Sequence, residues 1–164
     1  MTLRVLRGWL FATALALLLA GCATPPRPAV PPGVQVWTGR LALNVEGRAG
    51  ESFSAGFELK GAPETGELSL FNPLGGTVAV LAWAPGSALL RSGGKTREFP
   101  SLDALAEEAT GAPIPIAALF DWLAGKATPV AGWQADVSQV AEGRLRARRT
   151  DPPPVADLRL AFDH

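Results

Sequence analysis

The chain has 164 residues with 15 basic and 15 acidic side chains, so it carries no net charge near neutral pH and lacks the strongly basic footprint of a nucleic-acid-binding protein. Its only histidine is His164 and its only cysteine is Cys22, which excludes an intramolecular disulfide, a zinc site of cysteines and histidines, and the usual serine–histidine catalytic arrangement. The adjacent Glu107 and Glu108 cannot face each other on a helix, so we expect a solvated helix face there and no enzyme, cofactor or metal.

Residues 1–21 have the pattern of a secretory signal peptide. Arg4 and Arg7 precede the apolar run 9–19, and small residues follow it. The run is shorter than the roughly 20 apolar residues that a membrane-spanning helix needs. We therefore expect this segment to direct export and then to be removed, rather than to stay as a transmembrane anchor.

A lipidation site and a tether come next. Leu19-Ala20-Gly21-Cys22 resembles a lipobox, at which lipoprotein-maturation enzymes acylate the cysteine and cleave before it. Ala23 stands where aspartate would favour retention at the inner membrane under the sorting rule of enteric bacteria, so we expect an outer-membrane location. Residues 22–34 would then form the acylated, proline-rich tether, extended by about 3 Å per residue, and residues 35–164 the folded domain.

Strands dominate the first part of this domain. Apolar and polar residues alternate with the period of two that half-buried antiparallel strands show. The cluster Asn72-Pro73-Leu74-Gly75-Gly76 predicts a turn, and Ser92-Gly93-Gly94 predicts the turn of a hairpin. The predicted strands span residues 37–45, 53–60, a stretch that starts at Leu68, 77–83, 87–91 and 95–99.

The period then changes to that of helices. Ser101 can cap a first helix that Gly111 closes, and Pro115 can open a second helix that Gly125 closes. Strands return later in the chain. The fold class is therefore mainly β with α, a single antiparallel sheet that curls under a cover of two helices. The last predicted strands span residues 133–140, 144–149 and 157–162.

Large apolar side chains are frequent for a domain of this polar content. Buried aromatic groups dominate ordinary cores, so composition alone favours a solid core over a cavity for an apolar ligand between sheet and helices. On one regular helix, Phe120 and Trp122 diverge by about 200°, so we expect one of them at the rim of the interior. The candidate inward-facing residues are Trp37, Leu41, Phe53, Phe57, Leu70, Trp83, Phe120 and Trp122.

Four motifs in order resemble the outer-membrane lipoprotein receptor family LolB. They are a tryptophan before Gly39-Arg40-Leu41-Ala42-Leu43, a phenylalanine-rich second strand, the strand and turn of residues 66–75, and the helical segment of residues 109–125. The resemblance covers residues 35–164, apart from the unusual proline-rich connector 150–154. It implies a half-open β-barrel whose helices lid an apolar cavity, lined by the eight residues named above.

The resemblance also implies a function and partners. The chain would accept lipoproteins from a soluble periplasmic carrier and insert them into the inner leaflet of the outer membrane, as a monomer. Its partners would be that carrier, acylated client lipoproteins and outer-membrane phospholipid. No phosphate-binding G-x-x-x-x-G-K-[ST] loop occurs, so transfer would run downhill in affinity. The alternative is a lipid-anchored scaffold that binds a protein partner through a sheet edge and has no lipid cavity.

Two surface features complete the sequence predictions. A tight turn projects its tip away from the core, so Leu74 is expected to be exposed between Pro73 and Gly75. Scattered exposed leucines are normal, but the family resemblance implies that these three residues form a membrane-insertion loop. Arg144, Arg146 and Arg148 share one strand face, which fits either a basic strip for headgroups or an acidic partner, or a soluble edge strand. The edge strand is the reading we favour.

Overall fold

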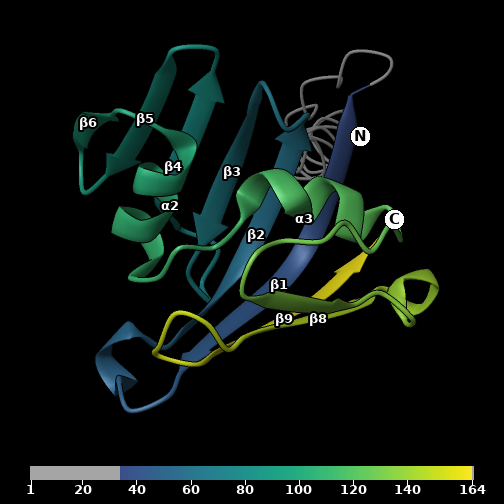
Figure 1. The fold of residues 1–164 in the computed structure, drawn as a ribbon. Helices are drawn as coiled ribbons and strands as arrows, with labels where there is room; N and C mark the ends of the chain where they lie inside the picture. The colour runs from purple at the N-terminus through teal and green to yellow at the C-terminus, as the bar shows by residue number, and fades with distance from the viewer. Residues whose placement is uncertain (1–33, 164) are drawn as a thin grey trace, which may run out of the picture. The chain divides into compact units, whose positions relative to one another are not determined.

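A computed structural model describes residues 34–163, which form one nine-stranded antiparallel sheet and two helices (Figure 1). The predictions for the signal peptide, Cys22 and most of the tether fall outside the described residues. The strands are β1 (Gln35–Val45), β2 (Phe53–Gly61), β3 (Gly66–Phe71), β4 (Thr77–Ala84), β5 (Ser87–Ser92), β6 (Lys95–Phe99), β7 (Trp133–Asp136), β8 (Arg144–Arg149) and β9 (Ala156–Asp163).

The sheet has the order β6-β5-β4-β3-β2-β1-β9-β8-β7. Strand β1 therefore lies inside the sheet, where it pairs with β2 on one side and with the last strand, β9, on the other. The sheet curls without closing, since β6 and β7 end the order of the described strands and do not pair with each other. The predicted curled antiparallel sheet with a helical cover is thus confirmed.

Both predicted helices are present. The first, α2 (Leu102–Thr110), begins where the Ser101 hydroxyl accepts a hydrogen bond from the backbone N–H of Ala104 at 3.1 Å, and ends at the left-handed Gly111. The second, α3 (Ile116–Leu123), follows Pro115. In Figure 1, α2 lies over β4–β6 and α3 crosses in front of the middle of the sheet.

The core lies between the helices and one face of the sheet. Alternate residues of the strands are buried, as the period-two pattern predicts, for example Leu41, Leu43 and Val45 in β1. Six of the eight residues of α3 are buried, so both sides of this helix are covered. A surface helix buries only one stripe, and α3 therefore forms part of the core itself.

Strand β7 is shorter than predicted. The alternation predicts a strand over residues 133–140, but β7 ends at Asp136. The Asp136 carboxylate accepts hydrogen bonds from the backbone N–H of Ser138 at 3.0 Å and from its hydroxyl at 2.6 Å. This local side-chain turn competes with strand pairing, and the short helix η2 (Val140–Glu142) follows it.

Gly39 marks a close approach of two backbones. A β-carbon at this position would overlap the carbonyl oxygen of Ala161 in the neighbouring strand β9. Gly39→Ala is therefore expected to lower the free energy of unfolding by about 3 kcal/mol, since backbone atoms cannot yield as side chains do. Urea unfolding would measure the loss. Gly50→Ala is the control, because no atom lies within 4 Å of its added carbon, and equal stability of the two variants would contradict the expectation.

Candidate functional site

The turn between β3 and β4 is held in one conformation by its own hydrogen bonds. The Asn72 side-chain oxygen accepts from the backbone N–H groups of Leu74 at 3.0 Å and Gly76 at 2.9 Å. The backbone N–H of Gly75 donates to the Asn72 carbonyl at 2.9 Å, and Gly75 has a φ of +84°, which favours glycine. The sequence Asn-Pro-Leu-Gly-Gly thus builds an ordered turn rather than a slack loop.

Leu74 stands at the tip of this turn with 95% of its surface exposed. Single exposed leucines are common on protein surfaces. The only neighbouring large apolar residue with substantial exposure is Val78, at 43%, among the described residues. The predicted exposure of Leu74 agrees with the structure, whereas its predicted contact with a membrane stays a prediction.

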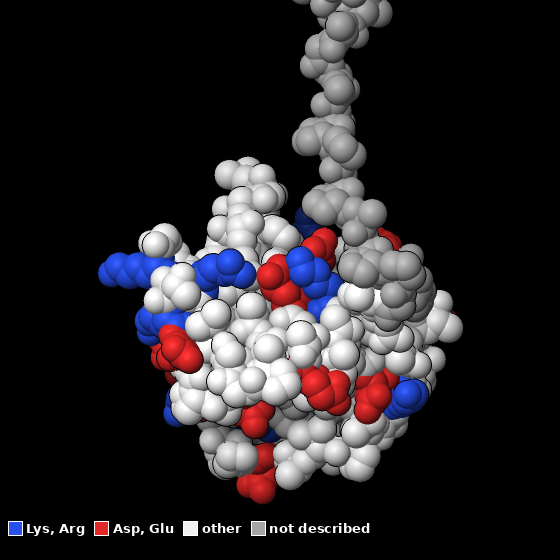
Figure 2. All heavy atoms as spheres, turned by 90° about the horizontal axis from the view of Figure 1, so that it is seen from above, with Lys and Arg blue, Asp and Glu red and all other residues white. Residues whose placement is uncertain are grey.

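Basic side chains lie beside the start of β4, which follows this turn. Thr77 and Val78, which follow the turn, line a surface hollow of about 300 Å³ together with the β5–β6 turn and Lys95. Lys95 is exposed and takes part in none of the ion pairs of the described residues, unlike Arg91, which contacts Glu67 at 3.5 Å. Figure 2 shows basic groups gathered toward the side of the domain where β5 and β6 lie. An apolar tip beside positive charge suits an anionic lipid surface.

Seven of the eight predicted cavity residues belong to the hydrophobic core, and Phe53 packs against it. Phe120 of α3 stands at the centre, with its ring 5.7 Å from that of Trp37 and 6.1 Å from that of Trp83, both edge-on. Phe53 is half-buried, and the other seven are at most 6% exposed. The Phe120 ring contacts the rings of Trp37 and Trp83, so an acyl chain could lie between them only if α3 and the sheet separated. The cavity stays a prediction.

The prediction that either Phe120 or Trp122 lies at the rim of the interior is wrong, because both side chains are buried. Phe120 is 3% exposed and Trp122 is fully buried. They do diverge, but Trp122 points away from the Phe120 cluster, packs against Trp133 at 6.3 Å and donates its indole N–H to the Thr128 carbonyl at 2.8 Å. The segment after α3 folds back over the helix, which pattern analysis of the helix alone cannot show.

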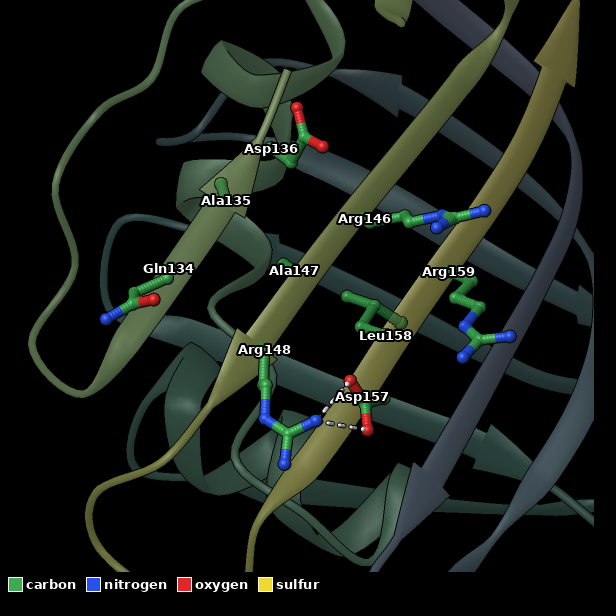
Figure 3. Close-up of a pocket in the computed structure, with 9 residues that line it drawn as sticks. All are labelled: Gln134, Ala135, Asp136, Arg146, Ala147, Arg148, Asp157, Leu158 and Arg159. Atoms are coloured by element: carbon green, nitrogen blue, oxygen red, sulfur yellow. Dashed lines mark hydrogen bonds and ion pairs between the residues drawn. The ribbon is translucent and has the colours of Figure 1, made fainter. Parts of the chain in front are cut away.

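Three arginines of β8, at positions 144, 146 and 148, lie on the outer face of the sheet. Figure 3 shows two of them, Arg146 and Arg148. The favoured reading of an edge strand is wrong, because β8 lies between β7 and β9. Arg148 pairs with Glu46 at 3.0 Å and Asp157 at 3.4 Å, whereas Arg146 lies directly opposite Arg159 in the register.

Two like charges opposed across strands are destabilising. A carboxylate on strand β7 offsets part of this repulsion, because Asp136 lies opposite Arg146 in the β7–β8 register. Hydrogen bonds from Ser138 hold the pKa of the Asp136 carboxyl below its ordinary value, with a smaller contribution from Arg146. This face is thus basic and partly compensated, and the strip stays a prediction.

The inner face of β8 holds a residue that the sequence analysis missed. Alternation puts Leu145, Ala147 and Arg149 on the side opposite the arginine strip, and all three are buried. The sequence contained a signal for this, because Arg149 falls on the same strand face as the apolar Leu145 and Ala147.

Within residues 34–163 no helix is long and apolar enough to cross a membrane, and no group of three or more His, Cys, Asp or Glu side chains is arranged to hold a metal ion.

Comparison with known proteins gives a consistent result. The family model described as "Outer membrane lipoprotein LolB" matches residues 36–152. A protein named outer-membrane lipoprotein LolB from Bordetella petrii is 34% identical over 184 residues, covering 94% of this chain and 91% of that protein. One of the same name from Chromobacterium violaceum is 30% identical over 92% of this chain and 84% of that protein. Another, from Bordetella parapertussis, is 39% identical over 72% of this chain and 63% of that protein.

Proposed function

Because the chain belongs to the LolB family of outer-membrane lipoproteins, we propose that it is a receptor in lipoprotein localisation, held on the periplasmic face of the outer membrane by acylated Cys22. It accepts lipoproteins from a soluble periplasmic carrier and inserts them into the inner leaflet. The family acts in lipoprotein localisation, so no enzymatic step is assigned. The lone cysteine supports the anchor, since acylation gives an exported lone thiol a role.

The observation that carries the proposal is the exposure of Leu74. Leu74 is 95% exposed on a turn that Asn72 holds in one conformation, so its side chain is free to contact an apolar surface such as the lipid of a leaflet. Full burial of one leucine contributes about 1.5–3 kcal/mol, which supports transient contact with a leaflet and is too little to anchor the domain. Leu74, flanked by Pro73 and Gly75, would dip into the leaflet and open a dry path for acyl chains.

The cluster around Phe120 is the proposed acyl-chain site. Each CH₂ removed from water contributes about 0.8 kcal/mol, so the acyl chains of a client need an apolar enclosure at every stage. The inner face of the sheet and α3 both contribute to the hydrophobic core of the described residues. We expect α3 to move away from Trp37 and Trp83 when a chain enters, since the three rings now fill this space.

Depletion of the protein in its native cell tests the proposed function. Client lipoproteins should accumulate in the periplasm or the inner membrane, because the last transfer step is missing. Fractionation followed by detection of several lipoproteins measures this, and re-expression of the intact chain is the control. Unchanged delivery of lipoproteins to the outer membrane would contradict the receptor function and favour the scaffold alternative.

A further inference from the structure

Arg149 is a buried cation without an acidic partner. It lies on the inner face of β8 and is 4% exposed. Its Nη2 donates to the carbonyl oxygen of Pro154 at 3.0 Å, and its guanidinium carbon lies 5.9 Å from the centre of the Trp133 ring. Its Nε is buried and has no hydrogen-bond partner. None of the ion pairs among residues 34–163 includes Arg149.

This arrangement leaves a buried positive charge without a direct ion pair. A guanidinium is a permanent positive charge, so its burial needs compensation by hydrogen bonds or by an anion. Buried charges are ordinarily paired, and an orphaned buried donor is costly. One carbonyl and one aromatic face satisfy only part of the guanidinium, whose geometry fits the two oxygens of a carboxylate or phosphate.

A hollow of about 250 Å³ adjoins the guanidinium. Pro113, Ile114 and Pro115, which connect α2 to α3, form one apolar wall, and Val130 and Trp133 form another. Two acidic side chains, Asp103 and Asp151, also border it. Both are exposed, and neither is ion-paired to Arg149. The hollow is therefore mainly apolar, with a cation in its wall.

The walls of this hollow are held firmly in place. The backbone N–H of Thr150 donates to the Gly132 carbonyl at 2.9 Å. Gly132 has a φ of +77°, and a β-carbon there would overlap the carbonyl oxygen of Asp151. The segment that carries Val130 and Trp133 thus touches the connector after Arg149 without space between them. A preformed hollow of this kind loses little freedom when it binds a ligand.

We propose that this hollow binds a carboxylate or phosphate carried on an apolar body, such as a fatty acid or a phosphate-bearing lipid, with Arg149 as the counterion. The anionic oxygens would take the free edge of the guanidinium, and the apolar body would lie along Ile114, Val130 and the proline wall. This goes beyond the proposed receptor function, because ester- and amide-linked acyl chains of a client carry no such charge.

The neighbouring Arg148 provides a matched control. It lies one residue away on the opposite face of the same strand, half exposed and already paired with Glu46 and Asp157. Removal of its charge should not affect a ligand on the inner face. Arg149→Met and Arg148→Met make the same chemical change in the same strand. They differ in which face of the sheet loses a charge and in whether that charge was ion-paired.

The experiment uses the acylated protein in nanodiscs of neutral phospholipid, with empty nanodiscs subtracted. Binding of octanoate, octyl phosphate and the uncharged octanamide is measured by calorimetry. Arg149→Met should weaken binding of the anionic probes at least about tenfold, and Arg148→Met less than about twofold. Neither change should alter the binding of octanamide. Preference for octanoate or for octyl phosphate identifies the natural chemistry.

A measurement on the unaltered protein covers the case in which Arg149→Met does not fold. The anionic probe should raise the melting temperature more than octanamide does, since only the anion pairs with Arg149. Equal shifts would overturn the proposal, as would equal binding to Arg149→Met and the unaltered protein, or no binding of either anion. Normal lipoprotein transfer by a folded Arg149→Met would leave the proposed function intact, so the two ideas fail separately.

Discussion

Leu74→Glu is expected to leave folding and acceptance of an acylated client intact and to block release into the membrane. The side chain is 95% exposed, so the domain does not depend on it for packing. Insertion of a charged carboxylate into a leaflet is unfavourable, whereas the leucine it replaces gains about 1.5–3 kcal/mol on burial, so transfer should slow at least tenfold. The variant is loaded with an acylated client and mixed with outer-membrane vesicles, and transfer to the vesicles is followed with time.

Two further variants isolate the apolar contact from the added charge. Leu74→Met keeps an apolar tip and should transfer normally. Thr96→Glu puts a carboxylate on the exposed strand β6, where Thr96 borders the hollow beside Val78 and Lys95. This variant should slow transfer far less. Normal transfer by Leu74→Glu would exclude the insertion role. A fall in its melting temperature would show that Leu74 packs on the domain in solution.

Cys22→Ala is expected to abolish attachment of the chain to the membrane. Acyl groups on this cysteine are the anchor that the sequence predicts once the predicted signal peptide is removed. Two or more acyl chains hold a protein stably, and Leu74 alone does not. The variant should be recovered as soluble periplasmic protein or as uncleaved precursor when membranes are sedimented. In vitro it should still bind clients, because the folded domain does the binding.

The mass of the recovered Cys22→Ala protein distinguishes a cleaved form from an uncleaved precursor. Mass spectrometry shows whether residues 1–21 have been removed, so that a retained signal segment is not mistaken for a lipid anchor. A cleaved Cys22→Ala protein that sediments fully with the outer membrane would contradict the anchor. Partial rescue of the depleted cell by the soluble form would agree with the division of roles between anchor and domain.

Local chemistry was sufficient for most elements of the fold. Alternation predicted the strands and their buried faces, and Ser101 and Gly111 predicted the limits of α2. Pro73 and the two glycines that follow in the turn predicted an exposed Leu74. These features depend on residues a few positions apart, so the sequence carries them directly. The prediction of a strand over residues 133–140 was wrong about the end of β7, although the turn formed by Asp136 and Ser138 is also local.

Strand order and the surroundings of individual residues required the tertiary structure. Strand β1 pairs with β9 from the other end of the domain, with Leu41 opposite Leu160, and β8 lies inside the sheet between β9 and β7. Backbone hydrogen bonds are the same for any pair of strands, so alternation fixes which face is buried but not which strand lies beside it. The burial of Trp122 and the hollow at Arg149 likewise arise where segments distant in sequence fold over one another, and only their packing decides what each side chain meets.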